Sequence, residues 1–144
     1  MTKGELAECY FRQGYNCSQA VALAFCDETG LDEKTTERLT IGFGGGIGRM
    51  REVCGAMNAS VFVLGAAFNE DKSSIYKRVQ ELADTFKKQN GSIICRELLG
   101  LSSKGNDSPN AEARTPEYYK KRPCPLIVHD AADALDAYLK ANKK

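Results

Sequence analysis

The sequence predicts an all-α protein: a single helical domain spanning residues 1–144, packed around a buried central helix. Two observations support this fold class. Apolar residues recur at helical spacing along most of the chain, and no stretch alternates with period two for long enough to form a strand. In addition, residues 53–68 contain only Asn58 and Ser60 as polar side chains, which is typical of a helix buried on nearly every side. A chain of 144 residues suffices for one sizeable core.

Caps and stop signals predict three helices before the central one. The expected ranges are 2–13, 17–29 and 32–41. Asn16 and Asp32 are good N-caps for the second and third helices, whereas Gly14 and Gly30 follow the first and second as natural stops. The glycines of residues 42–48 are expected to end the third helix and turn the chain into the central one.

Further helices are predicted after the central one. They begin near Ser73, Ser92, Thr115 and Cys124. The helix near Ser73 is long and amphipathic, with Ile75, Val79 and Leu82 on one face, and the last carries a clear apolar stripe. Between them, residues 102–113 are polar and contain Gly and Pro, which predicts a mobile loop.

The composition argues against several classes of function. The 20 basic and 19 acidic residues are interspersed and give a net charge of +1, so no nucleic-acid surface is expected. The N-terminus lacks the pattern of a signal peptide, and residues 53–68 are shorter than the roughly 20 apolar residues of a membrane span. A soluble, cytoplasmic protein is therefore predicted, in which six cysteines are reduced, catalytic or metal-binding rather than a disulfide framework.

Four cysteines share a position at or near the start of a predicted helix. They are Cys17, Cys54, Cys95 and Cys124. A helix N-terminus stabilises a thiolate, which lowers the cysteine pKa and makes the sulfur a better nucleophile or metal ligand. Cys9 and Cys26 fall inside helical patterns and are expected to pack as small hydrophobic residues. No CxxC pair is present, so the spacing predicts neither a thioredoxin-type site nor a zinc ribbon.

The order of these four cysteines, with Cys54-Gly55-Ala56 after a glycine-rich segment, resembles the redox-active proteins named for their C_GCAxxG_C_C pattern. The resemblance extends over residues 16–139. Its CGAxxG motif maps onto Cys54, Gly55 and Ala56, and its three further cysteines map onto Cys17, Cys95 and Cys124. One position differs, because Ala59 replaces the last glycine of the motif, and its methyl group affects how closely another helix can approach.

The resemblance implies a small bacterial or archaeal protein with a redox function and leaves the cofactor unknown. Some relatives carry haem, but covalent haem attachment needs CxxCH, which this chain lacks, so no covalent haem is expected. The redox partner is unknown as well. A homo-oligomer is compatible with the sequence.

The glycine-rich segment 42–48 has neither a preceding strand nor a Gly-Lys-Ser/Thr sequence, so it does not match a nucleotide-binding loop. A tight turn with close helix packing is expected. The alternative is a nest of backbone amides that binds an anion with help from Arg49 and Arg51. If this loop lies beside Cys54, it would also donate N–H groups to a thiolate.

Two polar side chains leave alternatives open. His129, the only histidine, follows Cys124 by about one turn and is either a solvent-facing or capping residue or a proton acceptor or metal ligand for the cysteines. Asn58 lies in the apolar central helix and needs a hydrogen-bond partner if it is buried, either the backbone or the cysteine pocket.

Three hypotheses for function follow. In the first, the four cysteines converge and cycle between dithiol and disulfide, with Cys54 in one pair, which would make the protein a thiol-dependent oxidoreductase. In the second, the same four thiolates hold zinc or an iron–sulfur cluster. In the third, the protein is a non-catalytic helical interaction module whose cysteines fill the core. The first two require the four sulfurs to lie close together.

Overall fold

The computed structural model describes residues 1–101, 107–121 and 123–143, and within these ranges the regular elements are helices. This confirms the all-α prediction. The only pairing of strand type in the described ranges is an isolated antiparallel bridge between Val53 and Ile94. Of the predicted loop 102–113, residues 102–106 lie outside the described residues, and residues 107–113 contain no helix.

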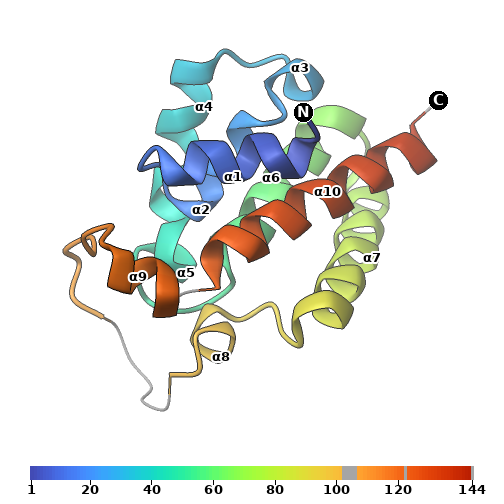
Figure 1. Ribbon diagram of the computed structural model, residues 1–144. Helices are drawn as coiled ribbons and strands as arrows, with labels where there is room; N and C mark the ends of the chain where they lie inside the picture. Colours follow the sequence, from blue (N-terminus) through green and yellow to red (C-terminus); the bar gives the residue numbers. More distant parts are fainter. Residues whose placement is uncertain (102–106, 122, 144) are drawn as a thin grey trace.

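The helices follow the predicted order (Figure 1). They are α1 (Lys3–Arg12), α2 (Cys17–Leu23), α3 (Cys26–Thr29), α4 (Glu33–Thr40), the 3-10 turn η1 (Ile41–Phe43), α5 (Gly44–Ile47), α6 (Gly55–Phe68), α7 (Lys72–Asn90), α8 (Cys95–Leu98), α9 (Pro116–Lys121) and α10 (Cys124–Asn142). Thr2 and Asn16 each form a reciprocal capping box with the residue three positions on, and the Asp32 side chain caps α4. These caps fix the starts of three helices.

The core lies between α1, α2, α6, α7 and α10. In Figure 1, α10 runs along α1 and crosses α6, while α7 packs beside α6 and α10. The most buried segment is 18–25 in and after α2, in which every residue is buried. The prediction that α6 is buried on nearly every side holds only as far as Leu64, since Gly65 and Ala66 are exposed.

Two predicted helices end earlier than the apolar pattern suggested. The helix predicted over residues 17–29 is interrupted after Leu23, because Phe25 has non-helical dihedrals, with φ −117° and ψ 24°. The Phe25 side chain is fully buried in the core. Lys3 then donates a hydrogen bond from its ammonium to the Ala24 carbonyl at 2.8 Å. The third helix ends at Thr40 rather than running on through Ile41, where the chain tightens into η1.

The glycine-rich segment forms a left-handed turn. Every residue from Gly45 to Arg49 has a positive φ, including the non-glycine residues Ile47 and Arg49, and Arg51 also has φ +60°. Left-handed backbone costs a non-glycine residue roughly 1–2 kcal/mol. Backbone hydrogen bonds between residues six apart stabilise the turn, such as the bond from the Arg51 N–H to the Gly45 carbonyl at 3.1 Å. Strained backbone of this kind is concentrated at functional sites.

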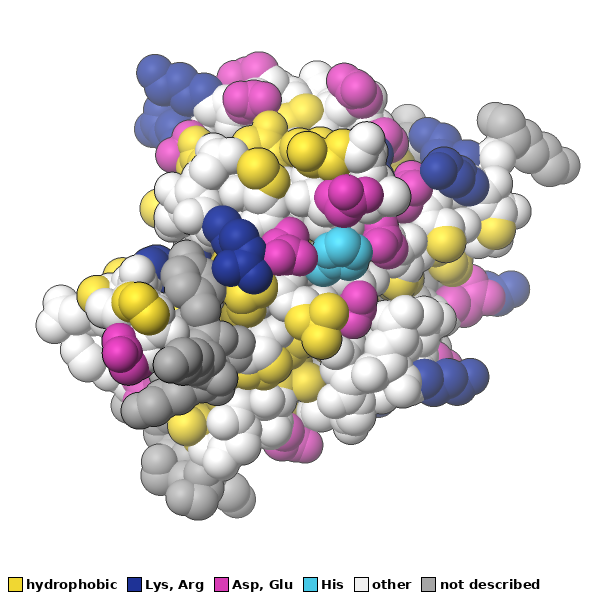
Figure 2. All heavy atoms as spheres, viewed as in Figure 1, with side chains coloured by type: hydrophobic (Ala, Val, Ile, Leu, Met, Phe, Trp, Pro, Cys, Tyr) yellow, Lys and Arg dark blue, Asp and Glu magenta, His cyan; other side chains and the backbone are white. Residues whose placement is uncertain are grey.

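The central helix begins at Gly55 rather than at Val53 as predicted. Val53 instead forms the bridge to Ile94, and Cys54 is the N-cap residue, with φ −51° and ψ 136°. Within the described chain, none of the helices has the length and apolar character that crossing a bilayer requires. Figure 2 shows acidic and basic side chains interspersed over one face of the molecule.

Candidate functional site

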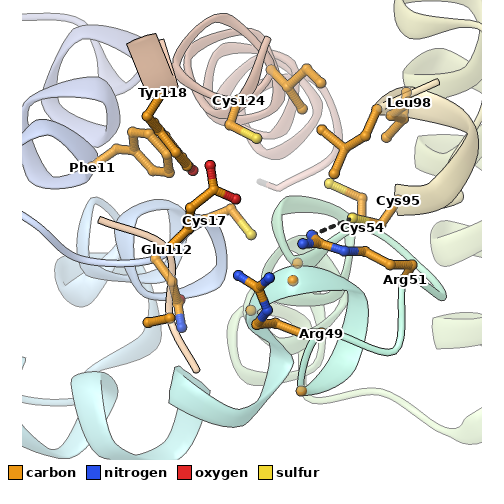
Figure 3. A pocket seen from close by; sticks show the side chains of 18 of the residues that line it. Phe11, Cys17, Arg49, Arg51, Cys54, Cys95, Leu98, Glu112, Tyr118 and Cys124 are labelled. Carbon is orange, nitrogen blue, oxygen red and sulfur yellow. Dashed lines mark hydrogen bonds between the residues drawn. The ribbon is translucent and has the colours of Figure 1, made fainter. Parts of the chain in front are cut away.

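All four predicted site cysteines line one pocket of about 420 Å³ (Figure 3). Its walls also include apolar side chains such as Phe11, Leu98 and Ile127, and charged ones that include Arg49 and Arg51. Figure 3 shows the four cysteine side chains directed into this space from different parts of the chain. The structure therefore brings together residues that lie up to 107 positions apart in the sequence, from residue 17 to residue 124.

Each of the four cysteines lies at a helix start, as predicted. Cys17, Cys95 and Cys124 are the first residues of α2, α8 and α10, and Cys54 is the N-cap of α6. The backbone N–H groups of Ala56 and Met57 point at the Cys54 sulfur. The glycine turn was expected to donate N–H groups to Cys54 only if it lay beside that residue, and the N–H of Gly45 points at the sulfur of Cys17.

The bridge between Val53 and Ile94 positions two of the cysteines. The Cys54 N–H donates to the Ile93 carbonyl at 2.7 Å, and the Cys95 N–H donates to the Glu52 carbonyl at 2.6 Å. Cys54 and Cys95 each directly follow a residue of the bridged pair, so the antiparallel register places the two cysteines diagonally across the bridge. The two thiols also interact electrostatically.

Cys95 has a buried cation beside its sulfur. The Arg51 side chain is 7% exposed, and its Nη1 donates to Cys95 Sγ at 3.6 Å while its Nε donates to Asp107 Oδ2 at 2.7 Å. Burial alone would lower the pKa of Arg51, but the hydrogen bonds to Asp107 and Cys95 raise that pKa on balance, so the guanidinium stays charged. Sequence reasoning placed Arg51 only in a possible anion nest and missed its contact with a cysteine.

Glycines allow this close packing. A Cβ at Gly46 would lie 2.6 Å from the Cys95 Cβ and 2.7 Å from the Glu52 nitrogen, so only glycine lets the turn rest against the bridge. A Cβ at Gly55 would collide with the Cys17 sulfur and lie 2.9 Å from the Phe43 carbonyl oxygen. Gly55 of the CGA motif is therefore the position where α6 and α2 meet through a cysteine.

We expect Gly55→Ala to destabilise the protein by about 1–3 kcal/mol, because the methyl group must displace the Cys17 sulfur or the backbone of η1. Urea unfolding of the reduced protein measures the change. Gly65→Ala is the matched control in the same helix, since a Cβ there meets nothing within 4 Å and alanine is the better helix former. Equal stabilities for the two variants would contradict the close approach at Gly55.

The predicted lowering of cysteine pKa values is wrong for two of the four. Burial raises the pKa of Cys54 well above the ordinary thiol value, and the neighbouring Cys17 adds to the effect. Burial also raises the pKa of Cys17, although the N–H of Gly45 acts in the opposite direction. The helix N-termini are present as predicted, but their effect is smaller than the cost of placing a charged sulfur away from water.

The raised pKa of Cys54 predicts a loss of stability in alkali. The unfolded state releases this proton near the ordinary pKa of about 9 while the folded state keeps it, so the contribution is complete below that pH and falls above it. Unfolding of wild type and Cys54→Ala at about pH 7.5 and about pH 9.5 should differ in pH dependence by about 1 kcal/mol. Parallel pH profiles for the two proteins would rule out a raised pKa.

His129 does not lie with the cysteines. Its Nδ1 is 3.1 Å from Glu8 Oε1 and its Nε2 is 3.2 Å from Asp133 Oδ2, so both ring nitrogens face carboxylates where α1 meets α10. Figure 2 shows this histidine, in cyan, between acidic side chains on the surface. The alternative that it serves as a proton acceptor or ligand for the cysteines is wrong, because His129 does not line the pocket and both its ring nitrogens face carboxylates.

The other cysteines and central-helix residues singled out in the sequence lie outside the lining of the pocket. Cys9 is exposed, against the expectation that it packs in the core, and Cys26 is half-buried with its sulfur 3.6 Å from the Thr36 hydroxyl. Neither lines the pocket. Asn58 donates to the Val53 carbonyl at 3.0 Å and so ties α6 to the bridge, whereas Ala59 is fully buried in the core, which accommodates its methyl group.

The cysteines are free thiols in the structure, and all six belong to the described residues. In that part of the chain, no group of three or more Cys, His, Asp or Glu side chains is arranged to hold a metal ion. The zinc or iron–sulfur alternative gains no support from this arrangement and stays a prediction. The arrangement brings neutral thiols and one thiol paired with a cation to a single pocket.

Comparisons with known proteins agree with the sequence resemblance. A family model described as "Putative redox-active protein (C_GCAxxG_C_C)" matches residues 15–138, which include all four pocket cysteines. No curated protein and no solved structure matches the chain. On the strength of the family match, the chain belongs to the C_GCAxxG_C_C family of putative redox-active proteins.

Proposed function

We propose that the protein is a thiol–disulfide oxidoreductase in which Cys95 attacks a disulfide substrate and Cys54 resolves the mixed disulfide. The observation that carries this proposal is that a buried arginine contacts one of two cysteines that lie diagonally across a backbone bridge and line the same pocket. The family description supports a redox role in general.

Cys95 is the better attacking group because of Arg51. The thiolate is the nucleophilic form of cysteine, and a guanidinium within hydrogen-bonding distance of the sulfur stabilises that form. The side chain of Arg51 is buried, so the interaction is little screened by solvent. Neither Cys17 nor Cys54 has a guanidinium contact of this kind among the described hydrogen bonds.

Cys54 suits the resolving step because it remains a neutral thiol at neutral pH, where burial keeps its pKa high. Because Cys54 is protonated, it holds a proton that it can transfer to the substrate thiolate released in the first exchange. In an ideal ladder, diagonal residues have Cα atoms about 7–8 Å apart, slightly more than the roughly 4.4–6.8 Å of a disulfide. Disulfide formation therefore requires a small movement of the bridge, which the α8 turn can absorb.

The chemistry balances as two exchanges. The Cys95 thiolate attacks one sulfur of the substrate disulfide, the substrate S–S bond breaks, and the first thiolate leaves. Cys54 then gives up its proton to a departing thiolate and attacks Cys95 Sγ, which releases the second half of the substrate. Two electrons pass from the protein dithiol to the substrate, and a small-molecule thiol in excess reverses the reaction.

Cys17 and Cys124 complete the pocket. Cys17 contacts Gly55 and interacts electrostatically with Cys54, so it is the second candidate for the resolving thiol. Cys124 faces the pocket from the start of α10. Exchange with Cys54 would let either of these thiols accept the disulfide once it has formed.

Mapping of disulfides after mild oxidation tests the proposal. Free thiols are blocked with an alkylating reagent, the protein is digested without reduction at acidic pH, and the disulfide-linked peptides are identified by mass spectrometry. We expect a linked pair of Cys54 and Cys95, with the exposed Cys9 unlinked as an internal control. A linked pair of Cys17 and Cys54 would reassign the attacking group, and no linkage among the four would overturn the proposed function.

A further inference from the structure

The pocket holds a second arginine whose hydrogen-bonding capacity is unfilled. Among the buried side-chain nitrogen and oxygen atoms of the described residues, only Arg49 Nε has no hydrogen-bond partner. Leaving such a group unpaired costs about 1–3 kcal/mol. The Arg49 side chain as a whole is 21% exposed, and Figure 3 shows its guanidinium directed into the pocket beneath the sulfur of Cys17.

The nearest carboxylate is already engaged by another residue. Asp107 Oδ2 accepts from Arg51 Nε at 2.7 Å, whereas Arg49 Nη2 lies 4.0 Å from the same oxygen, beyond hydrogen-bonding range. Two arginines thus share one carboxylate, and Arg51 has the closer contact. Positive charge remains on the Arg49 side of the pair, where it faces the pocket.

The backbone fixes Arg49 in this position. Its φ is +63°, its N–H bonds to the Gly44 carbonyl at 3.3 Å, and its carbonyl accepts from the Asp107 N–H at 3.0 Å. A Cβ at Gly45 would lie 2.7 Å from Arg49 Cγ, so the glycine makes room for the arginine stem. A strained and bonded backbone that aims a charged group into a cavity is a feature of pre-organised binding sites.

The other two arginines of the pocket are engaged by groups of the protein itself. Among the described residues, three arginines and one glutamate line it: Arg49, Arg51, Arg114 and Glu112. Arg114 donates to the carbonyls of Phe11 and Tyr15 at 2.8 and 2.9 Å and lies over the Phe11 ring. Arg51 is bound to Asp107 and Cys95. Arg49 is therefore the arginine with capacity for an incoming anion.

We infer that the substrate is a small disulfide bearing a carboxylate, which Arg49 binds while the disulfide faces the pocket cysteines. This inference rests on the proposed function and adds its substrate class. A pocket of about 420 Å³ is of the size that encloses a small molecule. A guanidinium binds a carboxylate through two parallel hydrogen bonds, which orients the ligand as well as attracting it.

Three small disulfides of similar length test the inference: dithiodiglycolate, which is anionic, hydroxyethyl disulfide, which is neutral, and cystamine, which is cationic. The second-order rate of oxidation of the reduced protein is measured with each. Because the three reagents differ in intrinsic reactivity, each rate is expressed as a ratio of wild type to variant. Arg49→Asn removes the charge and suits the left-handed backbone, and Arg49→Lys retains the charge.

For Arg49→Asn we expect the rate with dithiodiglycolate to fall about tenfold or more, and the rate with hydroxyethyl disulfide to change by less than about twofold. Arg49→Lys should lie between wild type and Arg49→Asn. Arg38→Asn, at an exposed arginine of α4, is the matched control and should leave all three ratios near one.

Equal losses with all three reagents would overturn the role of Arg49 in carboxylate recognition but leave thiol exchange standing. If wild type reacts with none of the three, the proposed function fails instead. A rate with dithiodiglycolate that is unchanged in Arg49→Asn, in a variant with wild-type circular dichroism, would also overturn the inference.

Discussion

Cys95→Ser should lower the rate at which the reduced protein reacts with hydroxyethyl disulfide by about 100-fold or more, because serine removes the thiolate that starts the exchange. The neutral reagent keeps the result independent of the charge at Arg49. Serine differs from cysteine by one atom and keeps the first residue of α8 in place, so the bridge between Val53 and Ile94 should persist.

The rate is followed by the release of hydroxyethyl thiol under pseudo-first-order conditions. Cys9→Ser is the matched control, since Cys9 is exposed on α1 and lies outside the pocket. It should change the rate by less than about twofold. A Cys95→Ser protein that reacts as fast as wild type would show that another cysteine makes the first attack.

Arg51→Met should slow the alkylation of Cys95 by iodoacetamide at about pH 7 by about tenfold. A hydrogen bond to a charged group is worth about 1.5–3 kcal/mol, and Arg51 Nη1 is the donor that contacts Cys95 Sγ, so its loss should slow the reaction of this sulfur. Methionine keeps much of the length of the buried stem while it removes the charge. Peptide-resolved alkylation kinetics report Cys95 separately from the other cysteines.

Arg96→Met is the matched control for Arg51→Met. Arg96 adjoins Cys95 in sequence, but its Nη2 donates to the Met50 carbonyl at 3.0 Å. Its removal should leave the alkylation of Cys95 within about twofold of wild type, after circular dichroism shows that both variants are folded. An equal effect of the two substitutions would mean that general charge, rather than the hydrogen bond from Arg51, governs Cys95.

Periodicity and caps predicted the helices well because both are local properties. The Asn16 capping box and the run of apolar residues in α6 depend on neighbours within one or two turns. The convergence of the four cysteines was proposed at first from their common place at helix starts and from the family resemblance. The structure shows each of them at a helix start, facing one pocket.

The features that sequence reasoning missed depend on contacts between distant segments. A five-residue left-handed turn that includes Ile47 and Arg49 has no local signal beyond its glycines, and the bridge from Val53 to Ile94 spans more than 40 residues. The same applies to Arg51. Its place in a charged turn predicts an exposed side chain, but in the folded protein the side chain is buried and contacts Cys95 of α8. Burial also reversed the predicted pKa direction for Cys54. The sequence indicates that this cysteine lies near a helix N-terminus, but it does not indicate how deeply the thiol is buried.

Trapping the mixed disulfide tests the order of attack most directly. Reduced Cys54→Ser protein is treated with one equivalent of hydroxyethyl disulfide, and the site of the adduct is identified by peptide mapping under acidic, non-reducing conditions. Without the resolving thiol, the adduct should accumulate on Cys95, whereas wild type under the same conditions should pass on to an internal disulfide. An adduct that accumulates on Cys17 or Cys124 instead, with Cys95 unmodified, would contradict the assignment of Cys95 as the attacking cysteine.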